Sequence, residues 1–140
     1  MNDYIVFCDG AYSSSLNQGG IGIVVLKREE DKLVIVSKYS KMFRNTTNNR
    51  MELLSAIYAL SAIKRAKSIT IYSDSMYLIG TVTQNWKRKK NQDLWEKLDK
   101  ILLNTKTPIN WFHVKGHSTS YYNNIADRLA VEASTIADLE

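Results

Sequence analysis

The sequence has little of what stabilises small secreted proteins or spans membranes. Cys8 is the only cysteine in 140 residues, so no internal disulfide can form and cysteine cannot supply a cluster of metal ligands. No apolar stretch approaches the roughly 20 residues that a membrane helix needs, and the first residues lead into a strand-like segment without a signal-peptide region. These absences predict a soluble, intracellular protein, located in the cytoplasm, with no membrane partner.

Residues that interrupt or connect domains are also scarce. The chain has one proline and six glycines, and no Ser-, Gly- or Pro-rich tract separates two periodic segments. With 44% hydrophobic residues, a chain of this length can bury one ordinary core, so we expect residues 1–140 to form a single domain. The net charge of +5 suits a polyanionic partner, although many basic proteins bind no nucleic acid.

The order of strand-like and helical periodicities predicts an α/β fold. Three strands precede the first helix, and the order βββαβααβα then places a five-stranded mixed sheet between helices. Ligands collect at strand ends in such sheets. The strands are expected at Tyr4–Asp9, Gly20–Lys27, Lys32–Tyr39, Ile69–Ser73 and Ile109–Val114, and the helices from Asn48 or Asn49 to about Lys67, from Asp74–Ser75, from Asp93, and at Asn123–Ala137.

Four acidic residues stand where apolar neighbours would carry them inward: Asp9, Glu52, Asp74 and Asp127. Taken singly, each could cap a helix or pair with a lysine. If the fold brings two of them within about 4 Å, their repulsion costs on the order of 4 kcal/mol at an effective dielectric constant near 20. Such a group needs cations, and oxygen ligands without cysteine suit Mg²⁺ or Mn²⁺ better than zinc.

These carboxylates lie within motifs whose order is specific. Through the motifs the chain resembles the type 1 ribonuclease H family, from about Tyr4 to Ala133. The motifs are Asp9-Gly10 before a glycine-bearing strand, Thr46-Thr47-Asn48-Asn49-Arg50-Met51-Glu52-Leu53, Tyr72-Ser73-Asp74-Ser75, and Val114-Lys115-Gly116-His117 followed by Asn123 and Asp127.

The resemblance implies a ribonuclease H-like fold and a metal-dependent endonuclease, a phosphodiester hydrolase that cuts the RNA strand of RNA/DNA hybrids. Its products would carry 5'-phosphate and 3'-hydroxyl ends, with little sequence preference. The four carboxylates would hold two Mg²⁺ ions, with Mn²⁺ as a substitute. His117 would carry protons or help the product leave, unless it is an exposed loop histidine without function. Family precedent favours a monomer with no obligatory protein partner.

The same resemblance assigns contacts with the hybrid. Backbone groups around Gly10 would meet the RNA 2'-hydroxyls, the start of the first helix would meet base and sugar edges, Thr47 and Asn85 would grip a DNA phosphate, and Trp86 would line the DNA channel unless it packs in the core. The complete set is Gly10, Ala11, Tyr12, Thr47, Asn48, Asn49, Arg50, Asn85, Trp86, Lys87, Arg88, Lys89 and Lys90.

One segment departs from the family's longer bacterial members. Residues 87–92 are too few for the extra basic helix and protruding loop of those enzymes, so we expect weaker, more salt-sensitive hybrid binding, partly offset by the cluster at Lys87–Lys90. Two alternatives stay open, a non-catalytic hybrid-binding module and a DNA-processing nuclease of the same superfamily. The four carboxylates argue against the first, and the run from Thr46 to Glu52 argues against the second.

Overall fold

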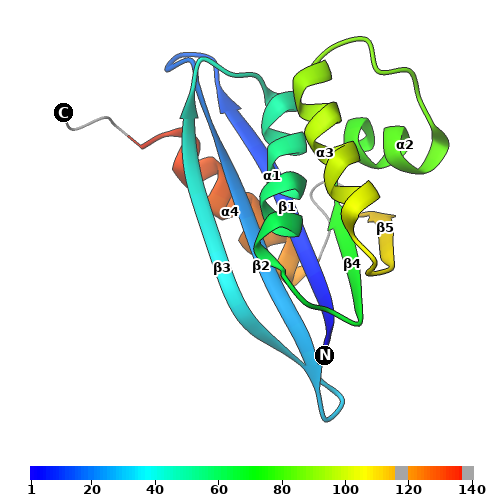
Figure 1. The fold of residues 1–140 in the computed structure, drawn as a ribbon. Coiled ribbons are helices and arrows are strands. Elements are labelled where there is room, and N and C mark those ends of the chain that lie inside the picture. Colours follow the sequence, from blue (N-terminus) through cyan, green and yellow to red (C-terminus); the bar gives the residue numbers. More distant parts are fainter. Residues whose placement is uncertain (116–119, 137–140) are drawn as a thin grey trace.

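The structure is a computed structural model of the chain, and it describes residues 1–115 and 120–136. The order of its elements matches the predicted one, and the predicted α/β fold is confirmed (Figure 1). In the described residues these elements are β1 (Asp3–Ser13), β2 (Gln18–Glu29), β3 (Lys32–Arg44), α1 (Asn48–Ala62), β4 (Ser68–Ser73), α2 (Met76–Gln84), α3 (Gln92–Asn104), β5 (Ile109–His113) and α4 (Tyr121–Ser134).

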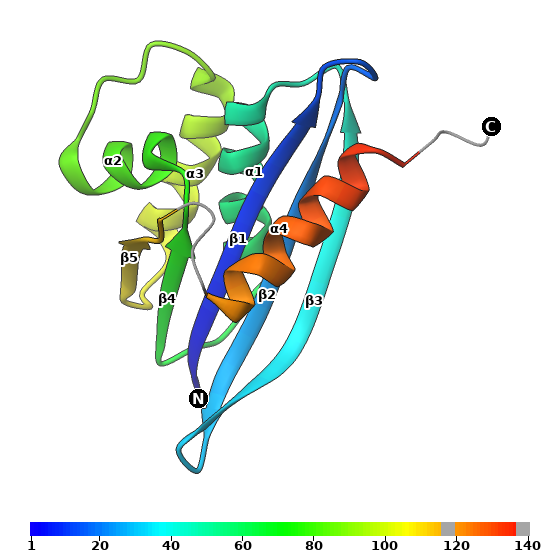
Figure 2. The same ribbon diagram turned by 180° about the vertical axis from the view of Figure 1, so that it is seen from behind.

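The five strands form one mixed sheet in the order β3-β2-β1-β4-β5. The pairs β1–β2 and β2–β3 are antiparallel, whereas β1–β4 and β4–β5 are parallel, as the helical connections require. Helices α1, α2 and α3 lie on one face (Figure 1), and α4 crosses the opposite face over β1, β2 and β3 (Figure 2). The sheet therefore lies between two helical layers, with a core on each side.

Successive side chains of β1 point alternately into the two cores. Val6 and Cys8 are fully buried on the side of α1, whereas Phe7 packs with Ala126 of α4 on the other side. Trp95 of α3 is buried in the larger core, and its indole N–H donates to the Tyr77 hydroxyl at 3.0 Å. Because β1 is central, both cores fix the part of this strand that carries Asp9.

Several bounds differ from those predicted. Helix α1 ends at Ala62 rather than near Lys67, because the chain becomes extended at its C-cap Ile63 (φ −91°, ψ 102°). Its N-cap is Thr47, whose hydroxyl accepts from the Arg50 amide at 3.2 Å, and not Asn48 or Asn49. Strand β1 continues to Ser13, beyond the predicted end at Asp9, because it pairs with β2 over its whole length.

The last helix and the connection between α2 and α3 complete the frame. Helix α4 begins at Tyr121, two residues earlier than predicted, because the Ser120 hydroxyl caps it. The predicted end at Ala137 lies outside the described residues. Helix α3 follows α2 after residues 85–91 with no helix between them, as expected. Within residues 1–115 and 120–136, no helix has the length and apolar character needed to cross a membrane.

Candidate metal and nucleic-acid site

Three of the four predicted carboxylates meet at one point. Asp9 lies on β1, Glu52 in the first turns of α1, and Asp74 directly after β4. One oxygen from each lies within 4.8 Å of the others. The side chains of Asp9 and Glu52 are buried, with 3% and 5% of their surface exposed, and Asp74 is half-buried. The fold therefore concentrates negative charge at this end of the sheet.

A glycine brings α1 against β1. A Cβ atom at Gly10 would lie 2.5 Å from the Glu52 backbone nitrogen, so any other residue would push the helix away from the strand. The Gly10 amide also donates to Asp9 Oδ1 at 2.9 Å and to Glu52 Oε1. The absence of a side chain and the position of this N–H together hold the two carboxylates side by side.

A second glycine brings α4 to the same place. Gly22 on β2 is the register partner of Asp9, and a Cβ atom there would lie 2.1 Å from the Ala126 carbonyl oxygen. The helix therefore packs directly on β2, which places the next residue, Asp127, beside Asp9. Hydrogen bonding with Asp127 is one of the causes that raise the Asp9 pKa. Asp127 itself is exposed, at the margin of the three-carboxylate group.

The electrostatic consequence is a strong preference for protons or other cations. Burial, followed by repulsion from Glu52 and Asp74, raises the pKa of Asp9 to about 11. Burial also raises the pKa of Glu52 to about 7, although hydrogen bonds from Asp9 and the Gly10 amide oppose it. No lysine or arginine in the described part of the chain pairs with these carboxylates. Among the described residues nothing compensates their charge, which suits a hard metal cation.

Two residues for which no role in the site was predicted, Ser75 and His113, support this group. The Ser75 hydroxyl caps α2 by accepting from the Leu78 amide at 3.1 Å, and its hydrogen bond with Glu52 lowers the pKa of that carboxyl. His113 on β5 lies with Nε2 3.3 Å from the Asp74 carbonyl oxygen. The capping pattern of Ser75 was visible in the sequence, whereas nothing local connects His113 with Asp74.

Polar residues at the start of α1 face the connection between α2 and α3. Thr47, Asn48 and Asn49 line a cavity of about 330 Å³ together with Lys90 and Asn91. Asn85, which was expected beside Thr47, does not line this cavity; it is the C-cap of α2, in a left-handed conformation (φ 56°). Asn91 was not predicted. The cavity offers hydroxyl and amide groups and one ammonium group, which suits a backbone phosphate.

Arg50 holds the far side of this cavity in place. Its guanidinium donates to both carboxylate oxygens of Asp93, at 3.0 and 2.8 Å, and to Asn91 Oδ1 at 3.3 Å. The pair lowers the pKa of Asp93 to about 2. The Asn91 amide in turn donates to the Tyr77 hydroxyl at 3.0 Å. Arg50, expected to contact the hybrid, therefore ties the α2–α3 connection to α1.

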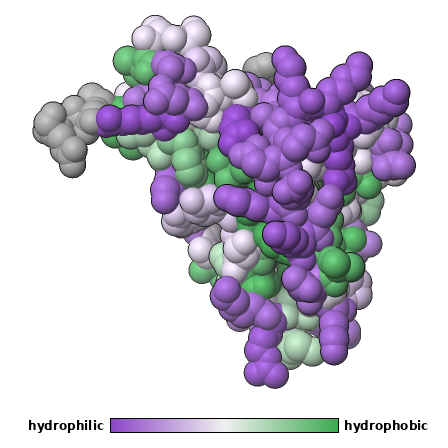
Figure 3. All heavy atoms as spheres, turned by 45° about the horizontal axis from the view of Figure 1, so that its top comes forward, coloured by the Kyte–Doolittle hydropathy of each residue, from purple (hydrophilic) through white to green (hydrophobic). Residues whose placement is uncertain are grey.

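The basic cluster at Lys87–Lys90 also contains one residue with a structural role and three exposed ones. Arg88 pairs with Asp99 at 2.5 Å and lies over the Trp95 ring, whereas Lys87, Lys89 and Lys90 are exposed. Hydrophilic side chains gather at this end of the molecule (Figure 3). Three cluster members are thus accessible to a polyanion.

Trp86 is neither a core residue nor isolated in solvent. It is 43% exposed, and a Cβ atom at Gly80 would lie 2.4 Å from its ring, so one face of the indole packs on α2. Ala11 and Tyr12 continue β1 beyond Gly10 and are partly exposed, with the Tyr12 hydroxyl donating to Asn17 at 2.8 Å. His117 lies outside the described residues.

Comparisons with known proteins agree with this geometry. The sequence model of the RNase H family matches residues 1–135. A protein of Clostridium botulinum named Ribonuclease H is 40% identical over 95% of this chain and 96% of its own length. A Ribonuclease H of Francisella philomiragia is 41% identical over 99% of this chain and 93% of its own. Both alignments are longer than this chain, at 150 and 151 residues, so each relative has residues that it lacks.

A solved structure extends the likeness to three dimensions. The crystal structure of LC9-RNase H1, described as a type 1 RNase H with the type 2 active-site motif, superposes with a TM-score of 0.81 at 27% identity. The superposition covers 96% of this chain and 72% of that one. The family model, which matches residues 1–135, spans the strands and helices that carry the three clustered carboxylates. By sequence and by structure, this chain belongs to the RNase H family.

Proposed function

We propose that this chain is a metal-dependent endonuclease, a phosphodiester hydrolase that cuts the RNA strand of RNA/DNA hybrids. The observation that carries the proposal is the meeting of Asp9, Glu52 and Asp74, whose oxygens lie within 4.8 Å of one another, in a member of the RNase H family. A hybrid-binding module without catalysis has no need of three like charges at one point. The cost of bringing these charges together is explained if the site binds cations.

The donor set fits Mg²⁺. Asp9, Glu52 and Asp74 would hold the ions, with Asp127 as a further ligand from α4, and all of these ligands are oxygens. The raised pKa values of Asp9 and Glu52 reflect the same uncompensated charge. Divalent ions bound here would supply an activated water and would stabilise the departing 3'-oxygen, leaving a 5'-phosphate on the product. Mn²⁺ satisfies the same ligand chemistry.

The chain's own residues would position the substrate. The cavity lined by Thr47, Asn48, Asn49 and Lys90 would bind a backbone phosphate, held open by the ion pair of Arg50. The exposed lysines of the α2–α3 connection would add non-specific attraction to the phosphate backbone. Contacts of this kind carry no base information, so we expect little sequence preference.

Two further roles belong to this proposal. The backbone after Asp9, from Gly10 to Tyr12, would meet RNA 2'-hydroxyls, which are absent from DNA and so distinguish the hybrid from duplex DNA. His117 would exchange protons with water near the site, since an imidazole with a pKa near 6.5 can donate and accept at neutral pH.

Cleavage assays on matched substrates test the proposal. End-labelled RNA/DNA hybrid, duplex RNA, duplex DNA and single-stranded RNA would each be incubated with Mg²⁺, Mn²⁺ or EDTA. We expect metal-dependent cutting of the RNA strand in the hybrid alone, with 5'-phosphate ends. Hybrid binding without cutting under either metal would contradict the proposal and favour the non-catalytic module.

A further inference from the structure

A hollow of about 320 Å³ lies between β3 and α4, the helix that lies in front of the sheet in Figure 2. The helix contributes most of its lining, and β3 contributes a lysine. The described residues that line the hollow are Lys38, Tyr121, Asn124, Ile125, Arg128 and Leu129. None of them has a role in the metal and hybrid contacts proposed above.

The hollow adjoins the carboxylates along the exposed surface of α4. Asn124 precedes Asp127 by three residues, and Arg128 follows Asn124 by four, so these side chains are neighbours on the surface of the helix. All three residues are exposed. A nucleic-acid strand that continues from the carboxylates over α4 therefore reaches the hollow within about one helical turn.

Two cations from different elements line the hollow. Lys38 comes from β3 and Arg128 from α4, and both are exposed. Neither forms an ion pair within residues 1–115 and 120–136. The described residues that line the hollow include no acidic one. The ammonium and guanidinium groups are therefore available to an anionic group, and a phosphate has the oxygens to accept hydrogen bonds from both.

An aromatic ring borders the same hollow and is open to solvent. Tyr121 is 68% exposed, and it makes an edge contact with Tyr122, with ring centroids 5.2 Å apart and planes at 77°. Tyr122 in turn packs on the buried Phe7 ring at 5.7 Å. The core therefore supports the exposed Tyr121 ring. Unpaired nucleic-acid bases stack on rings of this kind.

The hollow is a fixed feature of the fold. The Ser40 hydroxyl of β3 donates to the Leu129 carbonyl oxygen at 3.1 Å and so joins the strand to the helix. Gly20 allows α4 to pack directly on the sheet, because a Cβ atom there would lie 2.3 Å from the Ala130 carbonyl oxygen. A ligand would therefore bind a preformed surface, without first ordering a loop.

We propose that this hollow binds a nucleotide of an unpaired RNA segment that continues from the hybrid past the carboxylates. Lys38 and Arg128 would bind its phosphate, and its base would stack on Tyr121. The proposed function places the RNA strand at the carboxylates, and the inference rests on that function for the identity of the strand. A paired segment fits less well, because neighbouring bases cover the faces that stack. An acidic peptide would use the cations but not the ring.

Fluorescence anisotropy in EDTA tests the inference with a blunt hybrid and with hybrids that carry a short adenosine tail at either end of the RNA strand. Control hybrids carry an abasic tail, or the tail on the DNA strand. We expect one RNA tail to tighten binding about fivefold and the control tails to leave it within about twofold. Tyr121→Ala and Lys38→Glu should each remove the gain, whereas Tyr121→Phe, which keeps the ring, should retain it.

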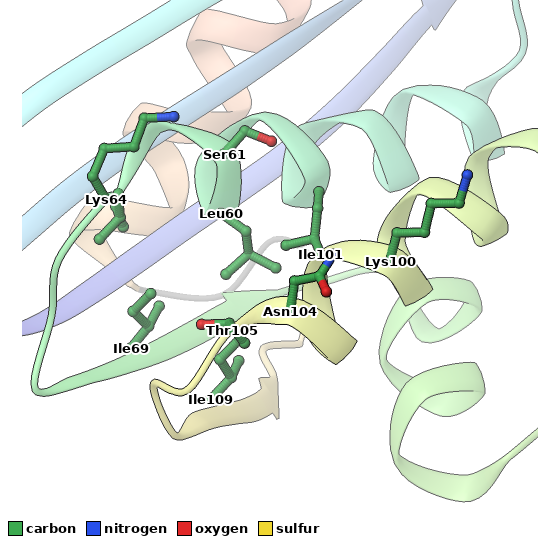
Figure 4. Close-up of a pocket in the computed structure, with 10 residues that line it drawn as sticks. Leu60, Ser61, Lys64, Ile69, Lys100, Ile101, Asn104, Thr105 and Ile109 are labelled. Carbon is green, nitrogen blue, oxygen red and sulfur yellow. The ribbon is translucent and has the colours of Figure 1, made fainter.

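Lys64→Glu is the matched variant for Lys38→Glu. Lys64 is an exposed lysine at a different hollow, of about 450 Å³, between the end of α1, α3 and the beginnings of β4 and β5 (Figure 4). There Lys64 and Lys100 border an aliphatic floor, and the described residues that line it include no aromatic side chain. Because that hollow has cations without a ring, Lys64→Glu should keep the gain from the RNA tail.

NMR spectra with oligoadenylate alone need no hybrid, and amide shifts are expected at Asn124, Ile125 and Arg128. Absent shifts there, an equal gain from the abasic tail, or loss of the gain in Lys64→Glu would overturn the inference. An acidic peptide that shifts these amides when oligoadenylate does not would overturn it in favour of a protein partner. A blunt hybrid left uncut with Mg²⁺ or Mn²⁺ would contradict the proposed function alone, since the shifts with oligoadenylate are measured without metal or hybrid.

Discussion

The two ends of α1 carry unpaired charge in opposite environments. At the start of the helix, Glu52 is buried against Asp9, with 5% and 3% of their surfaces exposed, and no basic residue in the described part of the chain neutralises them. Beyond its end, Lys64 faces Lys100 across an aliphatic floor, but both lysines are exposed and water solvates their charge. The two ends therefore differ in the burial of their charge as well as in its sign.

This difference in burial determines whether each end of the helix requires a bound ligand. Like charges in a buried site repel without screening, so the native state is relieved only by protons or bound cations. Exposed lysines at the end of a helix cost little and interact favourably with its dipole, so they do not by themselves require a partner. Substitutions and pH titrations test this contrast.

The largest effect is expected at Asp74. Asp74→Asn removes a carboxylate that would hold the ions while keeping its shape, so hybrid cleavage should fall by on the order of 10³-fold. The fold and most of the hybrid affinity should remain, since Asp74 is only half-buried. Single-turnover cleavage and circular dichroism would measure this, with Asp31→Asn in the β2–β3 turn as the control. Full activity in Asp74→Asn would remove this residue from the site.

A smaller kinetic effect is expected at His117. If its imidazole carries protons or helps the product leave, His117→Ala should slow turnover by about 10- to 100-fold without abolishing it. The wild-type rate should depend on pH around the imidazole pKa, and the variant should lose that dependence. A variant rate equal to that of the wild type at every pH from 6 to 9 would end the proton-carrier proposal.

The stability of the metal-free protein should depend on pH because of the buried carboxylates. The pKa values of Asp9 and Glu52 are raised in the folded state, so between about pH 4, where these groups titrate in an unfolded chain, and their folded values the native state binds more protons. Stability from this source is therefore full at low pH and is lost as pH rises. In EDTA, the melting temperature should fall between pH 5 and 8, and Mg²⁺ should restore it.

Asp9→Asn isolates this effect from other titrating groups. Because the amide needs no proton in the folded state, Asp9→Asn should stabilise the metal-free protein at pH 8 by on the order of 2 kcal/mol, about half of a full close repulsion. The gain should shrink at pH 5, where taking up that proton on folding costs the wild type less. Urea unfolding of both proteins at the two pH values gives the comparison. If Asp9→Asn is less stable than the wild type at pH 8 in EDTA, the buried charge does not strain the fold.

Much of this end of the molecule could be predicted from the sequence. The order of elements follows from periodicity. Asp9 and Asp74 follow strand segments that had to be buried, and Glu52 lies on a helix with a repeating apolar face, so their meeting was predictable once the strands were ordered. The support around them was less visible. Arg50 pairs with Asp93, 43 residues away, and no local pattern distinguishes that pairing from a contact with nucleic acid.

The other end was less predictable for a similar reason. Residues 63–67 include lysine and arginine, which favour helix, so propensity extended α1 toward Lys67. In the structure, the Lys67 amide donates to the Asn2 carbonyl at 2.7 Å and Ile69 is already buried in β4. Tertiary pairing overrides local propensity there. The hollow that results joins residues from four elements, which sequence spacing alone does not bring together.

The α2–α3 connection offers a comparison within one short segment. Lys90 is exposed and lines the cavity beside Thr47, whereas Arg88 is paired with Asp99. Lys90→Gln should weaken hybrid binding about threefold and reduce the salt slope by about 1, as expected for one lost phosphate contact. Arg88→Gln should leave the slope unchanged. Hybrid titrations in EDTA at several salt concentrations would measure both, and equal slopes for the two variants would contradict a specific role for Lys90.

The smallest effect is expected at Lys64, and it completes the contrast. This side chain is exposed and forms no ion pair within the described residues, so Lys64→Glu should change the free energy of unfolding by no more than about 0.5 kcal/mol. The direction should be destabilising, because an anion replaces a cation near the C-terminal end of α1. Urea unfolding at pH 7 without metal measures it beside Asp9→Asn. A loss above about 1.5 kcal/mol would be more than exposed charges contribute, and would show that the Lys64 side chain stabilises the fold through packing.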